Sequence, residues 1–174
     1  MKVVREPTEL EPRPRAVAIG SFDGVHRGHR AVFETAIETG LEPTVLTFDP
    51  HPRIALGNKV ELLTTLQRRL ELIDEAGIAT CLVAAFTPTL QRLSPQEFAE
   101  RYLRAIGAEI VVAGEDFRFG VRRSGDLGLL RELGFETLGP AEVEGVSSTA
   151  IRAALPLGQR RCQLGQVCPG ELGV

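Results

Sequence analysis

Short apolar runs alternate regularly with segments of helical periodicity, and this alternation restricts the fold more than any other feature of the chain. The runs are rich in Val, Ile, Leu and Ala and have the length of buried strands. They lie at 15–20, 43–48, 80–84, 109–113 and 135–138. Alternating strands and helices predict right-handed crossovers and a sheet covered on both faces. We therefore expect an α/β fold with a mostly parallel, five- or six-stranded sheet and helices on both faces.

The helix expected at 94–107 has the clearest local signals. Ser94 suits the N-cap position, and Glu97, three residues later, completes a capping box. Either Thr64 or Thr65 can cap the second helix along the chain. The other helices are expected at 28–40, 64–77, 125–133 and 148–155. Strand and helix therefore alternate from the first apolar run onward.

The most unusual turn follows the first predicted strand and reads Gly20-Ser-Phe-Asp-Gly-Val-His-Arg-Gly-His29. Its glycines permit tight turns and close approach of a ligand. The helix that follows presents unpaired N–H groups and a positive dipole end to an anion. His26 and His29 lie at this helix start, so both imidazoles can face a phosphate. A glycine-rich turn that contains histidines by chance is the alternative, but the strand before it and the helix after it favour a phosphate site.

A second turn, 114–120, follows the fourth predicted strand and reads GEDFRFG. Phe117 and Phe119 could line a planar ring system, with Arg118 near a phosphate. The alternative is a hydrophobic loop that only covers the edge of the sheet. Ligands of open parallel sheets bind beyond the carboxyl ends of the strands, where the strand order switches. The position of this turn therefore favours a role in binding.

Hydroxyl side chains gather at 147–149, with Arg152 about one turn later. Either Ser147 or Ser148 can cap the last predicted helix, which alone would explain the run. The same hydroxyls, exposed N–H groups and Arg152 can also clamp a second phosphate. The residues of this segment taken alone favour capping.

The loop after the second predicted strand reads TFDPHPR. Asp49 and His51 could touch a substrate. Pro50 and Pro52 fit a plain rigid loop equally well. Both interpretations stay open for this loop.

Composition excludes several classes of partner. The net charge of −3 provides no basic field for nucleic acid, and no apolar run is long enough to cross a bilayer. The amino-terminal segment lacks the apolar core of a secretory signal, so we expect a cytoplasmic protein with no nucleic-acid or membrane partner. Cys81 is expected to be a core thiol, and Cys162 and Cys168 are too far apart for a redox or zinc CxxC pair.

Five ordered segments, GSFDGVHRGH, TFDPHP, LSPQEFAERYL, GEDFRFG and SSTAIR, resemble the adenylyltransferase module of prokaryotic FAD synthetase. The resemblance runs from Ala16 to Arg152. It implies a Rossmann-like nucleotidyltransferase fold that transfers AMP from ATP to FMN, giving FAD and pyrophosphate. It also implies Mg²⁺ as a cofactor, with ATP and FMN as the substrates. Because the FMN phosphate is already a nucleophile, the site needs to align two anions and stabilise charge rather than activate a serine or cysteine.

The resemblance also implies roles for individual residues. His26, His29 and Arg152 are expected to act in catalysis. The residues expected to bind ATP are Gly20, Phe22, Asp23, Gly24, His26, His29, Gly114, Asp116, Ser147, Ser148, Thr149 and Arg152. The residues expected to bind the flavin are Asp49, Pro50, His51, Pro52, Phe117, Arg118 and Phe119. No residue is assigned to a metal, because no dense carboxylate cluster suggests a cage and Mg²⁺ can be held by phosphates and water.

The resemblance divides the chain into an FMN adenylyltransferase-like domain, 1–155, and a tail, 156–174. The tail occupies the place where the bifunctional enzyme continues into riboflavin kinase, so kinase activity is not expected and a separate kinase could supply FMN. Two alternatives remain at this point. One is a nucleotidyltransferase with another phosphorylated acceptor, such as phosphopantetheine, nicotinamide mononucleotide or a glycerol phosphate. The other is a non-catalytic remnant that binds flavin and adenine nucleotides.

Overall fold

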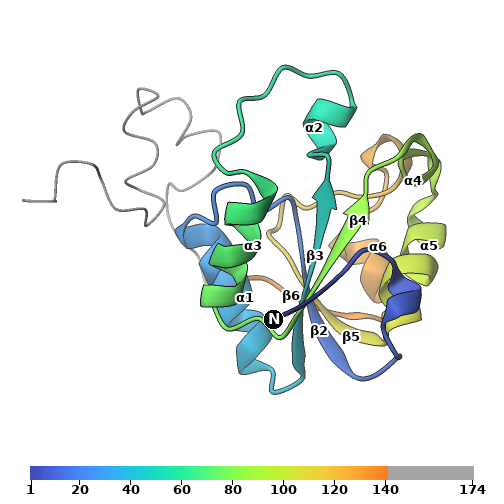
Figure 1. The fold of residues 1–174 in the computed structure, drawn as a ribbon. Helices are drawn as coiled ribbons and strands as arrows, with labels where there is room; N and C mark the ends of the chain where they lie inside the picture. The colour runs from blue at the N-terminus through green and yellow to red at the C-terminus, as the bar shows by residue number, and fades with distance from the viewer. Residues whose placement is uncertain (141–174) are drawn as a thin grey trace, which may run out of the picture.

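The computed structural model of the chain describes residues 1–140, which form a layered α/β structure around one sheet (Figure 1). The sheet has six strands in the order β1-β4-β3-β2-β5-β6, and every neighbouring pair is parallel. The strands are β1 (Lys2–Val4), β2 (Arg15–Ile19), β3 (Glu42–Asp49), β4 (Thr80–Ala85), β5 (Ala108–Val112) and β6 (Glu136–Leu138). The expected α/β class and parallel sheet are confirmed.

Helices cover both faces of the sheet, as expected. Figure 1 shows α1 (Arg27–Glu38) and α3 (Leu66–Glu75) on one side, and α5 (Pro95–Phe98) and α6 (Leu127–Glu132) on the other. The shorter elements are η1 (Pro7–Glu9), α2 (Pro52–Ala55), α4 (Pro88–Arg92), η2 (Ala99–Leu103), η3 (Arg104–Ile106) and η4 (Val121–Arg123). No helix in the described part of the chain is long and apolar enough to span a membrane.

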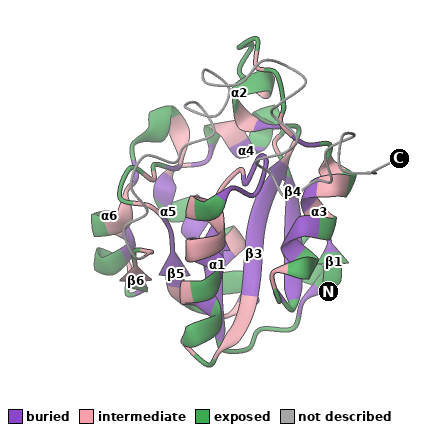
Figure 2. Cartoon of the chain, turned by 90° about the vertical axis from the view of Figure 1, so that its left-hand side faces the viewer, coloured by how far each residue is buried: buried purple, intermediate pink, exposed green. Residues whose placement is uncertain are grey.

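The core is split by the sheet into two apolar layers, because successive side chains of a strand point to opposite faces. In β2, Ala16 and Ala18 belong to the layer under α1 and α3, while Val17 and Ile19 belong to the layer under α5 and α6. Most of β3 is buried (Figure 2). Cys81 is fully buried in the first layer, which confirms the expectation of a core thiol.

The capping box predicted before α5 is present. The Ser94 hydroxyl accepts the Glu97 N–H at 3.2 Å, and the Glu97 carboxylate accepts the Ser94 N–H at 2.9 Å. The helical path then continues through η2, a π-helical stretch, and η3, a 3-10 turn, and stops at Gly107, which has φ of 78°. The expected boundaries are correct, although the segment is not one regular α-helix.

The amino terminus contains a strand that the sequence pattern did not predict. Residues 2–4 form β1, which pairs with β4 and buries Val4. A three-residue edge strand is too short to show periodicity, and its pairing is formed with residues far along the chain. Such long-range partners cannot be inferred from local pattern.

The topology brings the functional turns together at the carboxyl edge of the sheet. Strand β2 lies between β3 and β5, so the loops after these strands are neighbours at the point where the strand order reverses. This arrangement confirms that the turns at 20–29 and 114–120 follow adjacent strands. The expected helix at 148–155 lies outside the described residues.

Candidate active site

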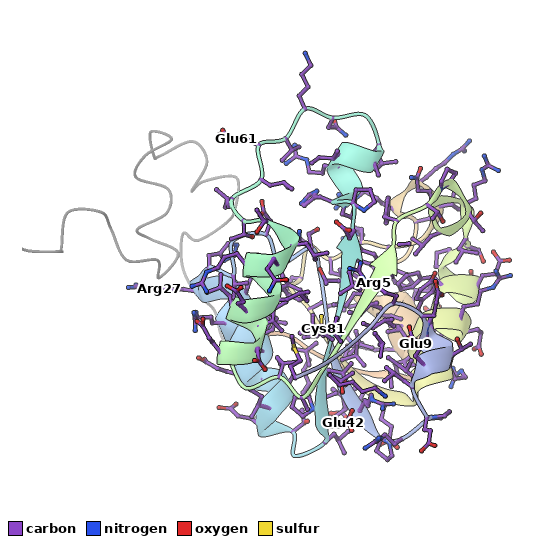
Figure 3. All side chains as sticks on the ribbon, viewed as in Figure 1. Arg5, Glu9, Arg27, Glu42, Glu61 and Cys81 are labelled. Atoms are coloured by element: carbon purple, nitrogen blue, oxygen red, sulfur yellow. The ribbon has the colours of Figure 1, made fainter. Side chains whose placement is uncertain are left out.

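The histidine turn links β2 to helix α1. His26 is the N-cap of α1, and its Nδ1 accepts the backbone N–H of His29 over 3.4 Å. Arg27, the first helical residue, is exposed and points outward (Figure 3). The amino end of this helix therefore carries both predicted histidines at the carboxyl edge of the sheet, where an anion would meet its positive dipole end.

The two imidazoles are stacked on each other. Their ring centroids lie 3.6 Å apart, with an angle of 20° between the planes. The ring of Phe22 meets the ring of His29 edge-on at 5.2 Å. His26 is buried and His29 half-buried. Phe22, which the resemblance assigned to ATP binding, is itself 2% exposed and packs against the ring of His29.

Two residues of the turn have backbone angles that non-glycine residues seldom adopt. Phe22 has φ of 49° and Val25 has φ of 41°. A positive φ is especially unusual for a β-branched residue such as Val25. Both side chains are buried in the layer under α1 and α3, so packing holds the backbone in this conformation. Strain of this kind concentrates at functional sites.

Asp23 fastens the turn to the segment that precedes α3. Its Oδ1 accepts the backbone N–H groups of Leu63 and Thr64, each at 3.0 Å, and the Thr64 hydroxyl at 3.2 Å. The N–H of Gly24 donates to the same hydroxyl at 3.1 Å. Thr65, rather than Thr64, is the N-cap of α3. Asp23 and Gly24 hold the turn in place, and their expected binding of ATP stays a prediction.

Arg69 and Thr47 were not anticipated from the sequence. Arg69 is 1% exposed, and its Nη1 donates to the carbonyl of Ser21 at 3.0 Å and of Phe48 at 3.2 Å. The Thr47 hydroxyl donates to the same Ser21 carbonyl at 3.1 Å. Burial lowers the pKa of Arg69, and the charges of Asp23 and Asp49 oppose this shift. The signal that could have revealed Arg69 is its place on the helix stripe that also carries Leu66, Leu70 and Ile73.

The loop after β3 leads into α2. His51 is buried and is the N-cap of α2, with its Nδ1 accepting the Arg53 N–H at 3.2 Å. The Asp49–Pro50 peptide is cis. The Asp49 carboxylate lies 3.8 Å from the guanidinium of Arg5. The residues assigned to the flavin on this loop, Asp49, Pro50, His51 and Pro52, thus form a structured bend at the edge of the sheet.

Helix α2 and the segment that follows it stand above the carboxyl edge of the sheet (Figure 1). This stretch carries three of the exposed large apolar side chains: Ile54, Leu56 and Leu62. Leu56 is the most exposed of them, at 58%. An apolar segment at this place can cover a planar ligand.

The loop after β5 holds two stacked aromatic rings. The rings of Phe117 and Phe119 lie 5.6 Å apart with 11° between their planes. Phe119 is buried, packs against Phe98 and exchanges two backbone hydrogen bonds with Gly125. Phe117 is half-buried on top of it. Of the two, Phe117 has the ring that a ligand can reach, and Phe119 anchors the loop.

The other predicted residues of this loop lie at its surface or at its start. Arg118 is exposed, and its guanidinium donates to two carbonyls of its own loop, those of Glu115 and Phe117. Asp116 is exposed and Gly114 half-buried at the end of β5. Gly20 is half-buried directly after β2, and its N–H donates to the Leu46 carbonyl at 3.1 Å. The remaining predicted site residues, Ser147, Ser148, Thr149 and Arg152, lie outside the described residues.

Comparison with known proteins places this geometry in a family. The sequence model of FAD synthetase matches residues 8–152. A bifunctional riboflavin kinase/FMN adenylyltransferase of Listeria monocytogenes is 38% identical over 159 residues, which cover 83% of this chain and 51% of that protein. A putative protein of the same name from Geobacillus thermodenitrificans is 38% identical over 167 residues, covering 91% of this chain and 92% of that protein. The chain thus spans about half of the Listeria relative.

Among solved structures, a macrolide-efflux protein from Streptococcus pneumoniae superposes with a TM-score of 0.80. Its sequence is 27% identical, and the match covers 96% of this chain and 62% of that chain. The fold of the described residues therefore has a close counterpart in an experimental structure. On the family match, which includes the histidine turn and both neighbouring loops, the chain belongs to the FAD synthetase family.

Proposed function

We propose that this chain transfers AMP from ATP to the phosphate of FMN, giving FAD and pyrophosphate. The observation that carries the proposal is the stacked pair His26 and His29 at the amino end of α1, where the strand order of the sheet reverses. Membership of the FAD synthetase family supports this reaction, and the names of the relatives support FMN as the acceptor. Both substrates are phosphorylated, which suits a site built around a helix amino terminus.

In the proposed reaction an oxygen of the FMN phosphate attacks the α-phosphorus of ATP. The bond from that phosphorus to the oxygen bridging the α- and β-phosphates breaks, and pyrophosphate leaves. The work of the protein is to align the two anions and to stabilise the charge that develops on them. The imidazoles of His26 and His29, with the N–H groups of α1, would bind the ATP phosphates.

The proposed acceptor site lies beside this turn, over the loop after β5. The accessible ring of Phe117 can stack on the isoalloxazine, and its buried partner Phe119 keeps it in place. The loop after β3, from Asp49 to Pro52, would form the side of the site that faces α2. The exposed Leu56 would then cover the ring system from above.

We assign the remaining contacts as part of the same proposal. The hydroxyls of 147–149 and the guanidinium of Arg152 would bind the β- and γ-phosphates, and 1–155 would be the catalytic unit. Mg²⁺ would enter with ATP, held by phosphate oxygens and water, since this ion needs few protein ligands, and it would offset phosphate charge. The reaction would take place in the cytoplasm on FMN made by a riboflavin kinase.

The test is to incubate the purified chain with ATP, Mg²⁺ and one acceptor at a time. We expect FAD and pyrophosphate in equal amounts from FMN. Phosphopantetheine, nicotinamide mononucleotide and glycerol 3-phosphate serve as the competing acceptors, and a dinucleotide formed faster from one of them would replace FMN in the proposal. Binding of ATP and FMN without any turnover would instead make the chain a binding protein.

A further inference from the structure

We infer that Arg69 is a positioning residue for the ATP site, because its guanidinium fixes the histidine turn against the carboxyl end of β3. This inference rests on the proposed function. Arg69 is expected to control ATP affinity without touching the substrates. It comes from helix α3, which lies on the same side of the sheet as α1 (Figure 1).

Three hydrogen bonds from one nitrogen join the turn to the strand. Nη1 of Arg69 donates to the carbonyl of Ser21, to the carbonyl of Phe48 and, at 3.4 Å, to the hydroxyl of Thr47. The Ser21 carbonyl also accepts the Thr47 hydroxyl, so Ser21 is held from two sides. Ser21 precedes the strained residue Phe22, whose ring supports His29. The position of Ser21 therefore affects the position of Phe22 and, through it, of the histidine pair.

The stability of the fold is a weak reason for an arginine at this place. Nε of Arg69 is buried and has no hydrogen-bond partner among residues 1–140. A buried charge with an incomplete set of hydrogen bonds contributes little or costs stability, and an apolar side chain of similar volume often replaces it without loss. The more informative property of Arg69 is the turn that it holds.

Arg15 provides an internal comparison. It is also fully buried, donates to the backbone carbonyls of Glu11 and Ile106, and has an Nη2 without a partner among the described residues. Its Nε donates to Glu42 at 3.1 Å. Arg15 begins β2 at the opposite edge of the sheet. Figure 3 shows its partner Glu42 at the end of the molecule far from Glu61, which lies in the segment above the carboxyl edge.

The two arginines therefore hold different parts of the fold: Arg69 holds the histidine turn, and Arg15 holds the start of β2. A displacement of the turn by a fraction of an ångström is sufficient to misalign phosphates and lower the rate or the affinity. Arg69 also keeps a positive charge under the turn that receives the ATP phosphates. Loss of Arg69 is expected to weaken ATP binding, whereas loss of Arg15 is expected to affect folding alone.

The experiment compares Arg69→Met and Arg69→Lys with Arg15→Met. We expect Arg69→Met to raise the KM for ATP by about tenfold or more. The KM for FMN should rise by a smaller factor, because Arg69 also holds the Phe48 carbonyl beside the proposed flavin loop. Arg69→Lys keeps the charge but not the geometry of the guanidinium. Its KM for ATP should therefore lie between those of the wild type and Arg69→Met. Arg15→Met should lower the melting temperature and leave both KM values near those of the wild type.

Thr47→Val is the second variant, for use if Arg69→Met does not fold. It removes one bond to Arg69 and one to Ser21, and should raise the KM for ATP in the same direction by a smaller factor. An unchanged KM for ATP in folded Arg69→Met, or an equal change in Arg15→Met, would overturn the inference. Calorimetric titration with ATP alone separates this from the proposed function: if the wild type makes no FAD, weaker ATP binding by Arg69→Met still supports the inference, and equal binding refutes it.

Discussion

The ring of His26 lies stacked on the ring of His29, with 3.6 Å between the centroids. His26 is also the N-cap of helix α1, because its Nδ1 accepts the backbone N–H of His29. The two histidines therefore differ in structural importance. One is part of the helix start, and the other is supported by it and by the edge of Phe22.

Substitution of the histidines should separate stability from turnover. We expect His29→Ala to lower kcat by about 100-fold or more, since each group that stabilises transition-state charge contributes on this scale. Its melting temperature should stay near that of the wild type. His26→Ala should lose activity and also about 1 kcal/mol of stability with the cap, a shift of about 2–4 °C.

His26→Asn is the matched control, because asparagine is a good N-cap but has no imidazole. It should recover the melting temperature without recovering activity. Steady-state assays and thermal melts of these variants check the prediction. A His29→Ala protein with the wild-type rate would show that the phosphate site has been placed incorrectly.

Replacement of Asp23 should loosen the turn. In the Asp23→Asn variant an N–H₂ group replaces one carboxylate oxygen; at the place of Oδ2 it faces the Leu63 N–H, so that bond is lost together with the charge. We expect a loss of about 1–3 kcal/mol in the free energy of unfolding, measured by urea denaturation. Asp126→Asn is the control, because Asp126 caps α6 through one bond and asparagine caps helices equally well. Equal stability of the Asp23→Asn variant and the wild type would show that the hydrogen bonds of Asp23 do not hold the turn.

Gly120 controls the position of the loop after β5. It has φ of +72°, and a Cβ at this residue would lie 2.8 Å from the backbone nitrogen of Pro95. Gly134 has φ of +89°, and a Cβ at this residue would have no other atom within 4 Å. Alanine at either residue should cost about 1 kcal/mol through backbone strain. Only Gly120→Ala should also displace Phe117 and raise the KM for FMN.

The two glycine variants are compared by urea denaturation and by the KM for FMN. Gly134→Ala is expected to keep the wild-type KM. If both variants have the same KM for FMN, the loop after β5 does not form the flavin site. A change in Gly134→Ala alone would point to α6 instead.

Glu42 should govern part of the stability in acid. Burial acts to raise the pKa of this carboxyl, but hydrogen bonds from Thr80 and Arg15 and the charges of Arg15 and Arg13 together lower it. A lowered pKa stabilises the fold above the unfolded value of about 4.3, and this contribution is lost as the pH falls through the folded pKa. Glu42→Gln should lack this dependence. It should also lose about 2 kcal/mol at neutral pH, since Arg15 stays buried without its partner charge.

Urea unfolding at several pH values between about 2 and 7 checks this prediction. The difference in stability between the wild type and Glu42→Gln should shrink towards the acid end. A constant difference would mean that Glu42 titrates alike in the folded and unfolded states.

Five strands and most helices could be predicted because buried strands and capped helices leave local patterns. Val17 and its neighbours form a continuous apolar run, and Ser94 with Glu97 forms a capping box within four residues. Strand β1 could not be predicted, because three residues carry no period and the pairing with β4 is formed across the chain. The short helix α2 begins at Pro52, a residue that also fits a plain loop.

In the candidate site, too, residues with a local sequence pattern could be predicted and residues with long-range contacts could not. His26 and His29 stand out because two of three histidines occupy one turn between a strand and a helix. The partners of Asp23 are about forty residues away, and those of Arg69 lie on other strands and loops. No local pattern identifies such contacts, so the residues that hold the turn were found only in the structure. Phe119 is buried against Phe117, a packing role that no local pattern indicated, and its expected contact with the flavin stays a prediction.

Transfer of AMP to FMN is tested by following the phosphorus atoms of ATP. The wild-type protein is incubated with FMN, Mg²⁺ and ATP labelled at either the α- or the γ-phosphorus, and the products are separated. We expect the α-label in FAD and the γ-label in pyrophosphate, at equal rates. Label that stays in ATP, or a γ-label that is transferred to the acceptor, would contradict it.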